Sequence, residues 1–201
     1  MHQAQYENPS KDGHFHADEA TIQAGHAQDK GYIHLYAGDG KGKTTAAVGL
    51  AIRAAARGWK VLFAQFLKSG NSAELKILDQ QAEVKILSGQ QIKKFTFAMT
   101  PEELAIATAE TTGRLEDIVS RADAFDLVVL DEALGAVGAG LLPADLLTDF
   151  MSQKPAHLEL VVTGRDPSPR MIELSDYYSE VCMRKHPYET EGLNARPGVE
   201  Y

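Results

Sequence analysis

The chain has 201 residues, and its 44% hydrophobic and 24% charged content is ordinary for a globular protein. Its 28 acidic and 20 basic side chains give a formal net charge of −8, which disfavours a general nucleic-acid surface and favours a small-molecule partner. The length suits one well-buried domain, and no long uncharged apolar run predicts a membrane span. The first residues lack the basic-then-apolar order of a secretory signal, so we expect a cytoplasmic protein.

Residues 1–30 are polar and show little periodicity, which predicts a flexible N-terminal arm ahead of a domain at 31–201. His14 and His16 form a pair, but two imidazoles without a third ligand are a poor metal site. We expect this arm to be solvated, and a lid function for it stays open.

Residues 32–57 read as strand, glycine-rich turn and helix. Residues 32–37 are apolar and β-prone, residues 38–42 read GDGKG, and Lys43 opens an alanine-rich helical pattern. The start of a helix carries unpaired backbone N–H groups and the positive end of the helix dipole, so a polyphosphate can bind there. This order predicts a phosphate-binding P-loop.

Two side chains in this stretch fit that role. Lys43 would place a point charge on a phosphate oxygen, and the hydroxyl of Thr44 would be a ligand for magnesium. The pattern G-x-x-x-x-G-K-[ST] is kept except at Ala37, which stands where the first glycine belongs. That departure argues against an ordinary ATPase or kinase loop.

The next elements alternate between helix and strand. Gly58 stands at the left-handed position after the first helix. Residues 59–67 form a nearly continuous apolar run, which suits a strand buried on both faces of a parallel sheet. Residues 68–72 follow its carboxyl end, where ligands bind in open α/β sheets. Residues 73–82 read as a helix and residues 84–87 as a short strand.

The following loop carries Phe95 and Phe97, which we interpret from the residues alone as core anchors. Thr100 then caps a helix whose first turn contains proline and Glu103, the pattern of a capping box. That helix is expected to run to about residue 121.

Residues 126–131 are again apolar and end in Asp131, which Glu132 follows. A hydrophobic strand that delivers carboxylates at its carboxyl end is the usual companion of a P-loop, because these groups hold magnesium directly or through water. We therefore predict Thr44, Glu132 and Asp131 as the metal-binding residues.

The last third of the chain continues the alternation. We expect a loop at 135–142, a helix from Pro143 and a buried strand at 158–163, after which Arg165 stands at the same sheet edge as Lys43. The single cysteine, Cys182, is expected to be a small buried hydrophobe. The alternation predicts a single-domain α/β fold with a doubly wound, mostly parallel sheet of the P-loop NTPase (RecA-like) type.

The tail at 184–201 is short of apolar periodicity and rich in hydrogen-bonding groups. It is either a disordered end or a segment folded over the ligand.

Five stretches, in order, resemble the ATP:corrinoid adenosyltransferases. They read GDGKGKTTAA, RAAARGWKVLFAQFLKSG, VVLDEAL, TGRDPSPRMIELSD and KHPYETEGLNARPGVEY, and the resemblance covers roughly residues 31–201. That family also lacks the first glycine of the usual P-loop, so Ala37 agrees with the resemblance.

The resemblance implies that Co(I) of a reduced corrinoid attacks the C5′ carbon of ATP, forming a cobalt–carbon bond and releasing tripolyphosphate. ATP would be the co-substrate with Mg²⁺ or Mn²⁺, in adenosylcobalamin biosynthesis or salvage. An electron donor such as a flavoprotein and a homodimer are also implied. The preferred corrinoid stays open among cobalamin, cobinamide and an a,c-diamide.

The resemblance also implies roles for individual residues. Lys43 and Arg165 would be catalytic, and Phe95 and Phe97 would face the corrin, against the interpretation as core anchors. Residues 184–201 would form a C-terminal segment over the active site. The ATP-binding residues would be Gly38, Asp39, Gly40, Lys41, Gly42, Lys43, Thr44, Thr45, Arg53, Arg165, Lys185, His186, Arg196 and Tyr201.

Two other functions fit part of the sequence. A P-loop kinase or ATPase would use the same lysine, threonine and glutamate, but Ala37 and the lack of a recognisable acceptor-activating base weaken it. A non-catalytic carrier of a corrinoid or nucleotide is the third interpretation.

Overall fold

A computed structural model describes residues 28–67, 72–87, 94 and 96–199. Its centre is a 6-stranded sheet in the order β3-β2-β4-β5-β1-β6, in which every neighbouring pair is parallel. The strands are β1 (Ile33–Ala37), β2 (Val61–Gln65), β3 (Val84–Leu87), β4 (Leu127–Asp131), β5 (Glu159–Gly164) and β6 (Tyr177–Glu180). The helices are α2 (Lys43–Ala55), α3 (Ala73–Leu78), α4 (Pro101–Arg121), α5 (Ala133–Gly138), α6 (Ala144–Gln153), α7 (Pro169–Leu174) and α8 (Pro187–Glu191), with short 3-10 turns at η1 (Thr96–Ala98) and η2 (Ala122–Ala124).

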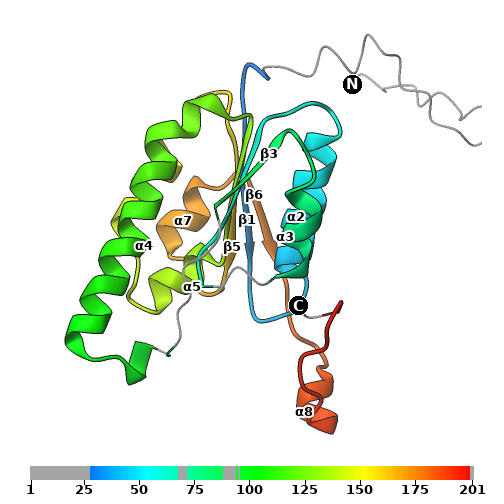
Figure 1. Ribbon diagram of the computed structural model, residues 1–201, viewed down its shortest axis with the longest axis vertical. Helices are drawn as coiled ribbons and strands as arrows, with labels where there is room; N and C mark the ends of the chain where they lie inside the picture. The colour runs from blue at the N-terminus through cyan, green and yellow to red at the C-terminus, as the bar shows by residue number, and fades with distance from the viewer. Residues whose placement is uncertain (1–27, 68–71, 88–93, 95, 200–201) are drawn as a thin grey trace, which may run out of the picture.

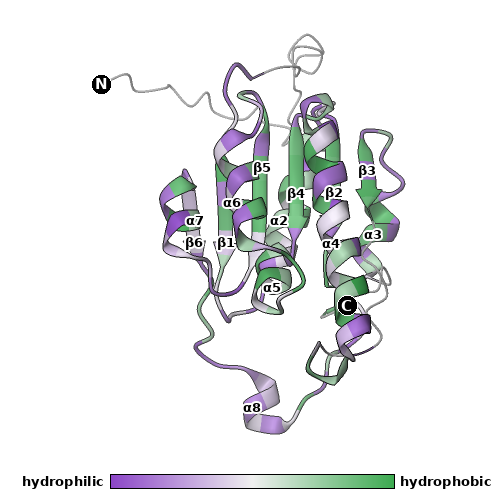
Figure 2. Ribbon diagram, turned by 90° about the vertical axis from the view of Figure 1, so that its left-hand side faces the viewer, coloured by the Kyte–Doolittle hydropathy of each residue, from purple (hydrophilic) through white to green (hydrophobic). Residues whose placement is uncertain are grey.

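Helices cover both faces of the sheet. On one face, α2 and α3 bury a cluster that includes Ala51, Leu78 and Phe63. On the other face, α4, α5, α6 and α7 pack over a larger cluster that includes Leu115 and Leu35 (Figure 1). The strands between them are mostly apolar (Figure 2). The predicted doubly wound parallel sheet is therefore confirmed, and the described pairs are parallel throughout.

Local sequence signals explain several element boundaries. The side chain of Thr100 accepts a hydrogen bond from the backbone N–H of Glu103, and the Glu103 side chain accepts one from the backbone N–H of Thr100, which completes the predicted capping box of α4. Gly58 has φ +76°, which is the left-handed conformation expected after α2. All five residues of β2 and of β4 are buried, as continuous apolar runs predict.

The expected loop at 135–142 is wrong in its first half. Residues Ala133–Gly138 form α5, because Ala133, Leu134 and Ala136 lie on one side of the segment and pack onto the sheet. The expected helix at 73–82 ends at Leu78, after which backbone turns lead directly into β3. Strand β6 and helices α7 and α8 were not predicted, because their runs of four to six residues carry little periodicity.

The prediction for Cys182 is also wrong. Its thiol is free and exposed, because β6 ends at Glu180 and the chain leaves the sheet before residue 182. In the described part of the chain, no helix combines the length and the apolar character needed to cross a membrane.

Candidate active site

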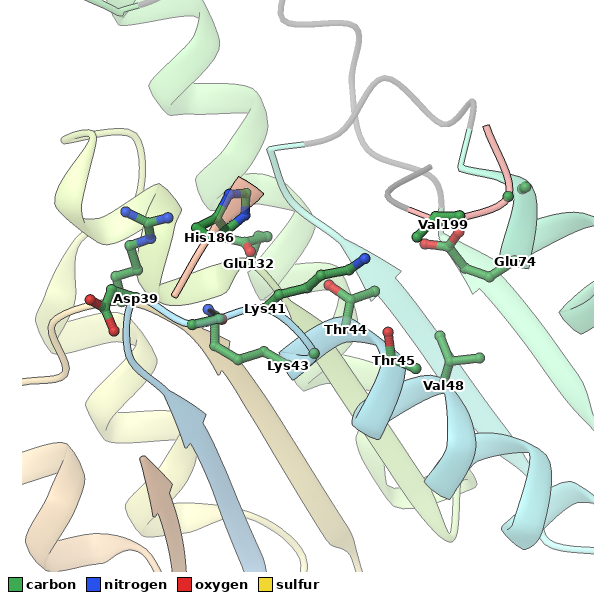
Figure 3. A pocket seen from close by; sticks show the side chains of 15 residues that line it. Asp39, Lys41, Lys43, Thr44, Thr45, Val48, Glu74, Glu132, His186 and Val199 are labelled. Carbon is green, nitrogen blue, oxygen red and sulfur yellow. Dashed lines mark hydrogen bonds between the residues drawn. The ribbon is translucent and has the colours of Figure 1, made fainter. Parts of the chain in front are cut away.

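A pocket of about 460 Å³ opens at the carboxyl edge of the sheet. Its wall combines residues that follow β1, β2, β4 and β5 with residues from the C-terminal segment. The lining residues are Asp39, Gly40, Lys41, Gly42, Lys43, Thr44, Thr45, Val48, Ala73, Glu74, Glu132, Arg165, His186, Gly198 and Val199. Figure 3 shows Asp39 and His186 toward one end of the pocket and Glu74 and Val199 toward the other, with Lys41 and Thr44 between them.

The glycine-rich loop leads from β1 into the amino end of α2. Gly38 has φ +116° and Gly42 has φ +120°, a conformation that L side chains rarely adopt. Gly42 is the N-cap residue of α2, and no side chain of the described residues caps that helix end. The first amides of α2 therefore face the pocket with a helix dipole behind them, which suits a polyphosphate.

Residues 181–183, which directly follow β6, hold the first half of this loop. The N–H of Gly40 donates to the carbonyl of Val181 over 2.7 Å, and the N–H of Met183 donates to Oδ1 of Asp39 over 2.9 Å. A Cβ on Gly38 would lie 2.6 Å from the Val181 carbonyl oxygen, and one on Gly40 would lie 2.7 Å from it. Both positions thus require glycine because another backbone approaches closely, and Gly38 requires it for its φ as well.

This contact changes the interpretation of Asp39. The Met183 N–H holds the pKa of the Asp39 carboxyl below its usual value, so the side chain is an anion at the mouth of the pocket. A carboxylate repels phosphate, and the hydrogen bond from Met183 gives this side chain a structural role. Phosphate binding at Asp39 stays a prediction that concerns the backbone of the loop and not this carboxylate.

Lys43 is buried in the floor of the pocket. Its Nζ donates to the carbonyl of Gly40 over 2.8 Å. Burial lowers the pKa of Lys43, whereas the charge of Glu132 raises it. The ammonium is therefore partly desolvated and points toward the glycine-rich loop. A phosphate oxygen bound in the pocket can replace the Gly40 carbonyl as its hydrogen-bond partner.

Asp131 lies behind the loop with no exposed surface. Its Oδ1 accepts hydrogen bonds from the hydroxyls of Thr44 (2.9 Å) and Thr163 (2.8 Å). Its Oδ2 accepts one from the amide of Gln65 (3.2 Å). Asp131 thus holds the hydroxyl of Thr44 in a fixed orientation.

Glu132 and Arg165 reach the pocket from the ends of β4 and β5. Glu132 has φ 60°, which is uncommon for a residue with a side chain and is compatible with strain stored at a functional site. Its backbone N–H donates to the Thr163 hydroxyl over 3.0 Å. Arg165 is exposed and lies close enough to Lys43 to lower its pKa.

The oxygen donors at this point fit a magnesium ion that arrives with a nucleotide. Thr44 supplies a hydroxyl, Glu132 a carboxylate that lines the pocket, and Asp131 a carboxylate directly behind Thr44. Hydroxyl and carboxylate oxygens are the ligands that Mg²⁺ prefers, and Mg²⁺ usually takes few protein ligands besides phosphates and waters. No group of three or more His, Cys, Asp or Glu side chains within the described ranges could hold a metal by itself.

The structure brings together most, but not all, of the predicted site residues. Residues 39–45, Glu132, Arg165 and His186 line the pocket, whereas Gly38 does not. Also outside the lining are Arg53, Lys185 and Arg196, which are exposed. Arg53 lies ten residues along α2 from Lys43, which is about 15 Å at 1.5 Å per residue.

Of the two residues predicted to face the corrin, only Phe97 lies within the described residues. Phe97 is 86% exposed, so the interpretation as a core anchor is wrong for this residue. Phe95 and Tyr201 lie outside the described residues.

Several lining residues were missed by sequence reasoning. Val48 lies one helical turn after Thr44 in α2, so helix geometry alone brings it near the loop. Ala73 and Glu74 in α3, and Gly198 and Val199 in the tail, reach the loop only through tertiary structure. Thr163 and Gln65 were also missed as partners of Asp131. The available signal was their position as polar residues near the carboxyl ends of apolar strands.

Comparison with known proteins gives a consistent family. Residues 29–201 match the family described as ATP:corrinoid adenosyltransferase BtuR/CobO/CobP. A corrinoid adenosyltransferase of Pseudomonas aeruginosa is 31% identical over 92% of this chain and 89% of its own length. One of Escherichia coli is 29% identical over 92% of this chain and 93% of its own length. The corrinoid adenosyltransferase CobA of Salmonella typhimurium is 29% identical and covers 87% of both chains.

Proposed function

The chain belongs to the ATP:corrinoid adenosyltransferase family, and from that premise we propose that it transfers the 5′-deoxyadenosyl group of ATP to a reduced corrinoid. Co(I) attacks the C5′ carbon, and the electron pair of the C5′–O bond leaves with the bridging oxygen as tripolyphosphate. The cobalt becomes formally Co(III) with a cobalt–carbon bond. The nucleophile carries no proton, so the reaction requires no general base.

In this proposal the pocket stabilises the departing triphosphate. Negative charge grows on the bridging oxygen as the C5′–O bond breaks. Donors that already point at the developing charge stabilise the transition state, because they need no reorganisation during the reaction. Lys43, Arg165 and the first amides of α2 are the donors that the geometry offers.

Thr44 and Glu132 would hold the magnesium ion, with Asp131 orienting Thr44 from behind. When bound, Mg²⁺ supplies positive charge to the triphosphate oxygens. The hydrogen bond from Thr44 to Asp131 keeps a lone pair of the hydroxyl available as a ligand. Asp131 is buried, so we assign it a supporting role and leave direct contact to Thr44 and Glu132.

The corrinoid would approach from the side of the C-terminal segment and of the loop before α4. His186, Gly198 and Val199 already line the pocket, and we propose that Lys185, Arg196 and Tyr201 complete this cover when both substrates are bound. The 86% exposed ring of Phe97 supports the proposal that it contacts the corrin, with Phe95 as its neighbour. An apolar wall there would exclude water from the cobalt centre.

One observation carries the proposal for this chain itself. A cation, a hydroxyl, a carboxylate and a guanidinium, from Lys43, Thr44, Glu132 and Arg165, meet in one pocket at the amino end of α2. Family membership alone would not require these groups to converge in this sequence. Their convergence supports binding of a metal-bound triphosphate.

Product analysis tests the proposal against a kinase or ATPase. The protein is incubated with ATP, Mg²⁺ and chemically reduced cobalamin, and the phosphorus products are resolved. We expect tripolyphosphate and a light-sensitive alkylcobalamin in equal amounts. ADP and phosphate as the main products would refute adenosyl transfer.

Three parts of the proposal rest on the family rather than on the site. We propose a cytoplasmic enzyme, a homodimer, and an electron donor such as a flavoprotein that reduces Co(II). Sedimentation of the purified protein tests the dimer. Replacing the chemical reductant by a reduced flavoprotein tests the electron donor.

A further inference from the structure

We infer that Gln65 is a positioning residue that fixes Asp131, and through it Thr44, for metal binding. This inference rests on the proposed function, because it concerns the magnesium site assigned there. Gln65 is the last residue of β2, and Asp131, the last residue of β4, is its register partner in the sheet. Neither side chain has exposed surface, so they meet in the interior behind the loop.

The amide of Gln65 bridges two carboxylates. Its Nε2 donates to Oδ2 of Asp131 over 3.2 Å and to Oε1 of Glu74 over 3.2 Å. Glu74 lines the pocket from the first turn of α3. One neutral donor thus bridges the two carboxylates and offsets part of their mutual repulsion. Without that donor the repulsion would push Asp131 away from Glu74, and Oδ2 would lose its bond to Gln65.

The two oxygens of Asp131 are held from opposite sides. The hydroxyls of Thr44 and Thr163 donate to Oδ1, and the Gln65 amide donates to Oδ2. Rotation of the carboxylate would break at least one of these bonds. Gln65 therefore helps to fix the plane of the Asp131 carboxylate, and the orientation of the Thr44 hydroxyl follows.

A purely structural glutamine is a poor explanation for this position. Its Oε1 is buried and finds no hydrogen-bond partner among the residues that the structure describes. An unpaired buried acceptor costs stability, and an apolar residue of similar volume would avoid that cost. The side chain is accounted for by its two donated bonds, both of which lead to carboxylates at the pocket.

Arg114 fixes the backbone at the same point. Its Nη1 donates to the carbonyl of Gln65 over 3.0 Å from the middle of α4. The guanidinium is half-buried. Because α4 and α2 cover opposite faces of the sheet, Arg114 holds the end of β2 from the face opposite α2. Arg114 thus holds the backbone of Gln65, while the Gln65 side chain binds the carboxylates of Asp131 and Glu74.

The test compares metal binding in the wild type and three variants. Gln65→Met removes both donated bonds at nearly constant volume, and Gln65→Asn keeps an amide that is one methylene too short to reach both carboxylates. Gln153→Met is the matched control, because Gln153 is exposed at the end of α6, distant in the fold from Asp131. Thermal unfolding first establishes that each variant folds.

Two readouts require no turnover, and the KM for the corrinoid serves as a separate check for general loosening of the fold. Manganese binding to the ATP-loaded protein is followed by electron paramagnetic resonance without corrinoid, and ATP binding is measured by calorimetry across a series of Mg²⁺ concentrations. We expect either Gln65 variant to need about 10- to 100-fold more metal, the range found when groups that orient metal ligands are removed. The KM for the corrinoid should stay within about twofold, a split that general loosening of the fold would not produce.

The outcomes separate this inference from the proposed function. If the wild type binds ATP without any metal dependence, the magnesium site of the proposed function fails. If the wild type depends on metal and a folded Gln65 variant shows the same dependence as wild type and Gln153→Met, the role of Gln65 is refuted. Should Gln65→Met not fold, Gln65→Asn alone decides between these results.

Discussion

Lys43→Met is the substitution with the sharpest expected effect. The Nζ atom of Lys43 lies 2.8 Å from the Gly40 carbonyl oxygen, and the residue is only 7% exposed. The ammonium is therefore already directed at the loop, in a site where water screens its charge less than at the surface. Two unit charges about 4 Å apart interact by about 4 kcal/mol at an effective dielectric constant of about 20. Removal of one preorganised donor to a developing anion costs about 2.7–4 kcal/mol, which is about 10²- to 10³-fold in kcat.

The stability of this variant should hardly change. Methionine loses the hydrogen bond to Gly40, which is worth about 1 kcal/mol. It also removes an ammonium whose burial lowers its pKa and therefore opposes the charged form. These effects have opposite signs, so we expect the free energy of unfolding to change by less than about 1 kcal/mol.

The assay follows alkylcobalamin formation in a single turnover with saturating ATP and reduced cobalamin. Denaturant unfolding of the same samples measures stability. Lys85→Met, at an exposed position in β3, is the control and should keep wild-type activity. A folded Lys43→Met protein whose rate lies within about threefold of wild type would contradict stabilisation of the leaving triphosphate by this residue.

Further predictions concern the loop, the metal and pH. Thr44→Val should raise the Mg²⁺ requirement of ATP binding by about tenfold or more, whereas Thr44→Ser, which keeps the hydroxyl, should restore it; calorimetry decides. Asp39→Ala should raise the KM for ATP because the Met183 N–H loses its acceptor, whereas Asp39→Asn, which keeps Oδ1, should not. Equal KM values in the two variants would argue against a role for this contact. Arg165→Met should lower kcat by about 10²-fold without changing the unfolding midpoint, because its side chain is exposed. Burial lowers the pKa of Lys43, so the lysine is fully charged at low pH and loses its charge as pH rises through that lowered pKa. We therefore expect kcat/KM for ATP to fall as pH rises, and Lys43→Arg, which stays charged, should remove that fall.

The phosphate loop could be predicted from sequence because its signals are local. Lys43 and Thr44 follow the glycines within one turn, and Asp131 ends an apolar strand, so spacing alone places them. The parallel sheet then brings the carboxyl ends of β1, β4 and β5 to one edge. Arg165 was predicted at the pocket for the same reason, and the structure places it there.

Other contacts depend on pairings that spacing does not determine. The loop is held by Val181 and Met183, which are about 140 residues away in sequence and reach it only because β6 pairs with β1. Gln65 meets Asp131 because β2 lies beside β4, an order that the sequence does not specify. Cys182 was misplaced because β6 ends at Glu180 and all four of its residues are exposed, which residue type alone does not reveal.

The central claim is that the loop holds three phosphates as one departing group, so that the bond broken lies between ribose and oxygen. The direct measurement uses ATP with ¹⁸O at the bridge between C5′ and the α-phosphorus, followed by mass analysis of both products after one turnover. We predict that the label leaves with tripolyphosphate and that the adenosyl group on cobalt carries none. Label retained on the sugar would mean that a phosphorus–oxygen bond was cleaved, and would contradict the mechanism.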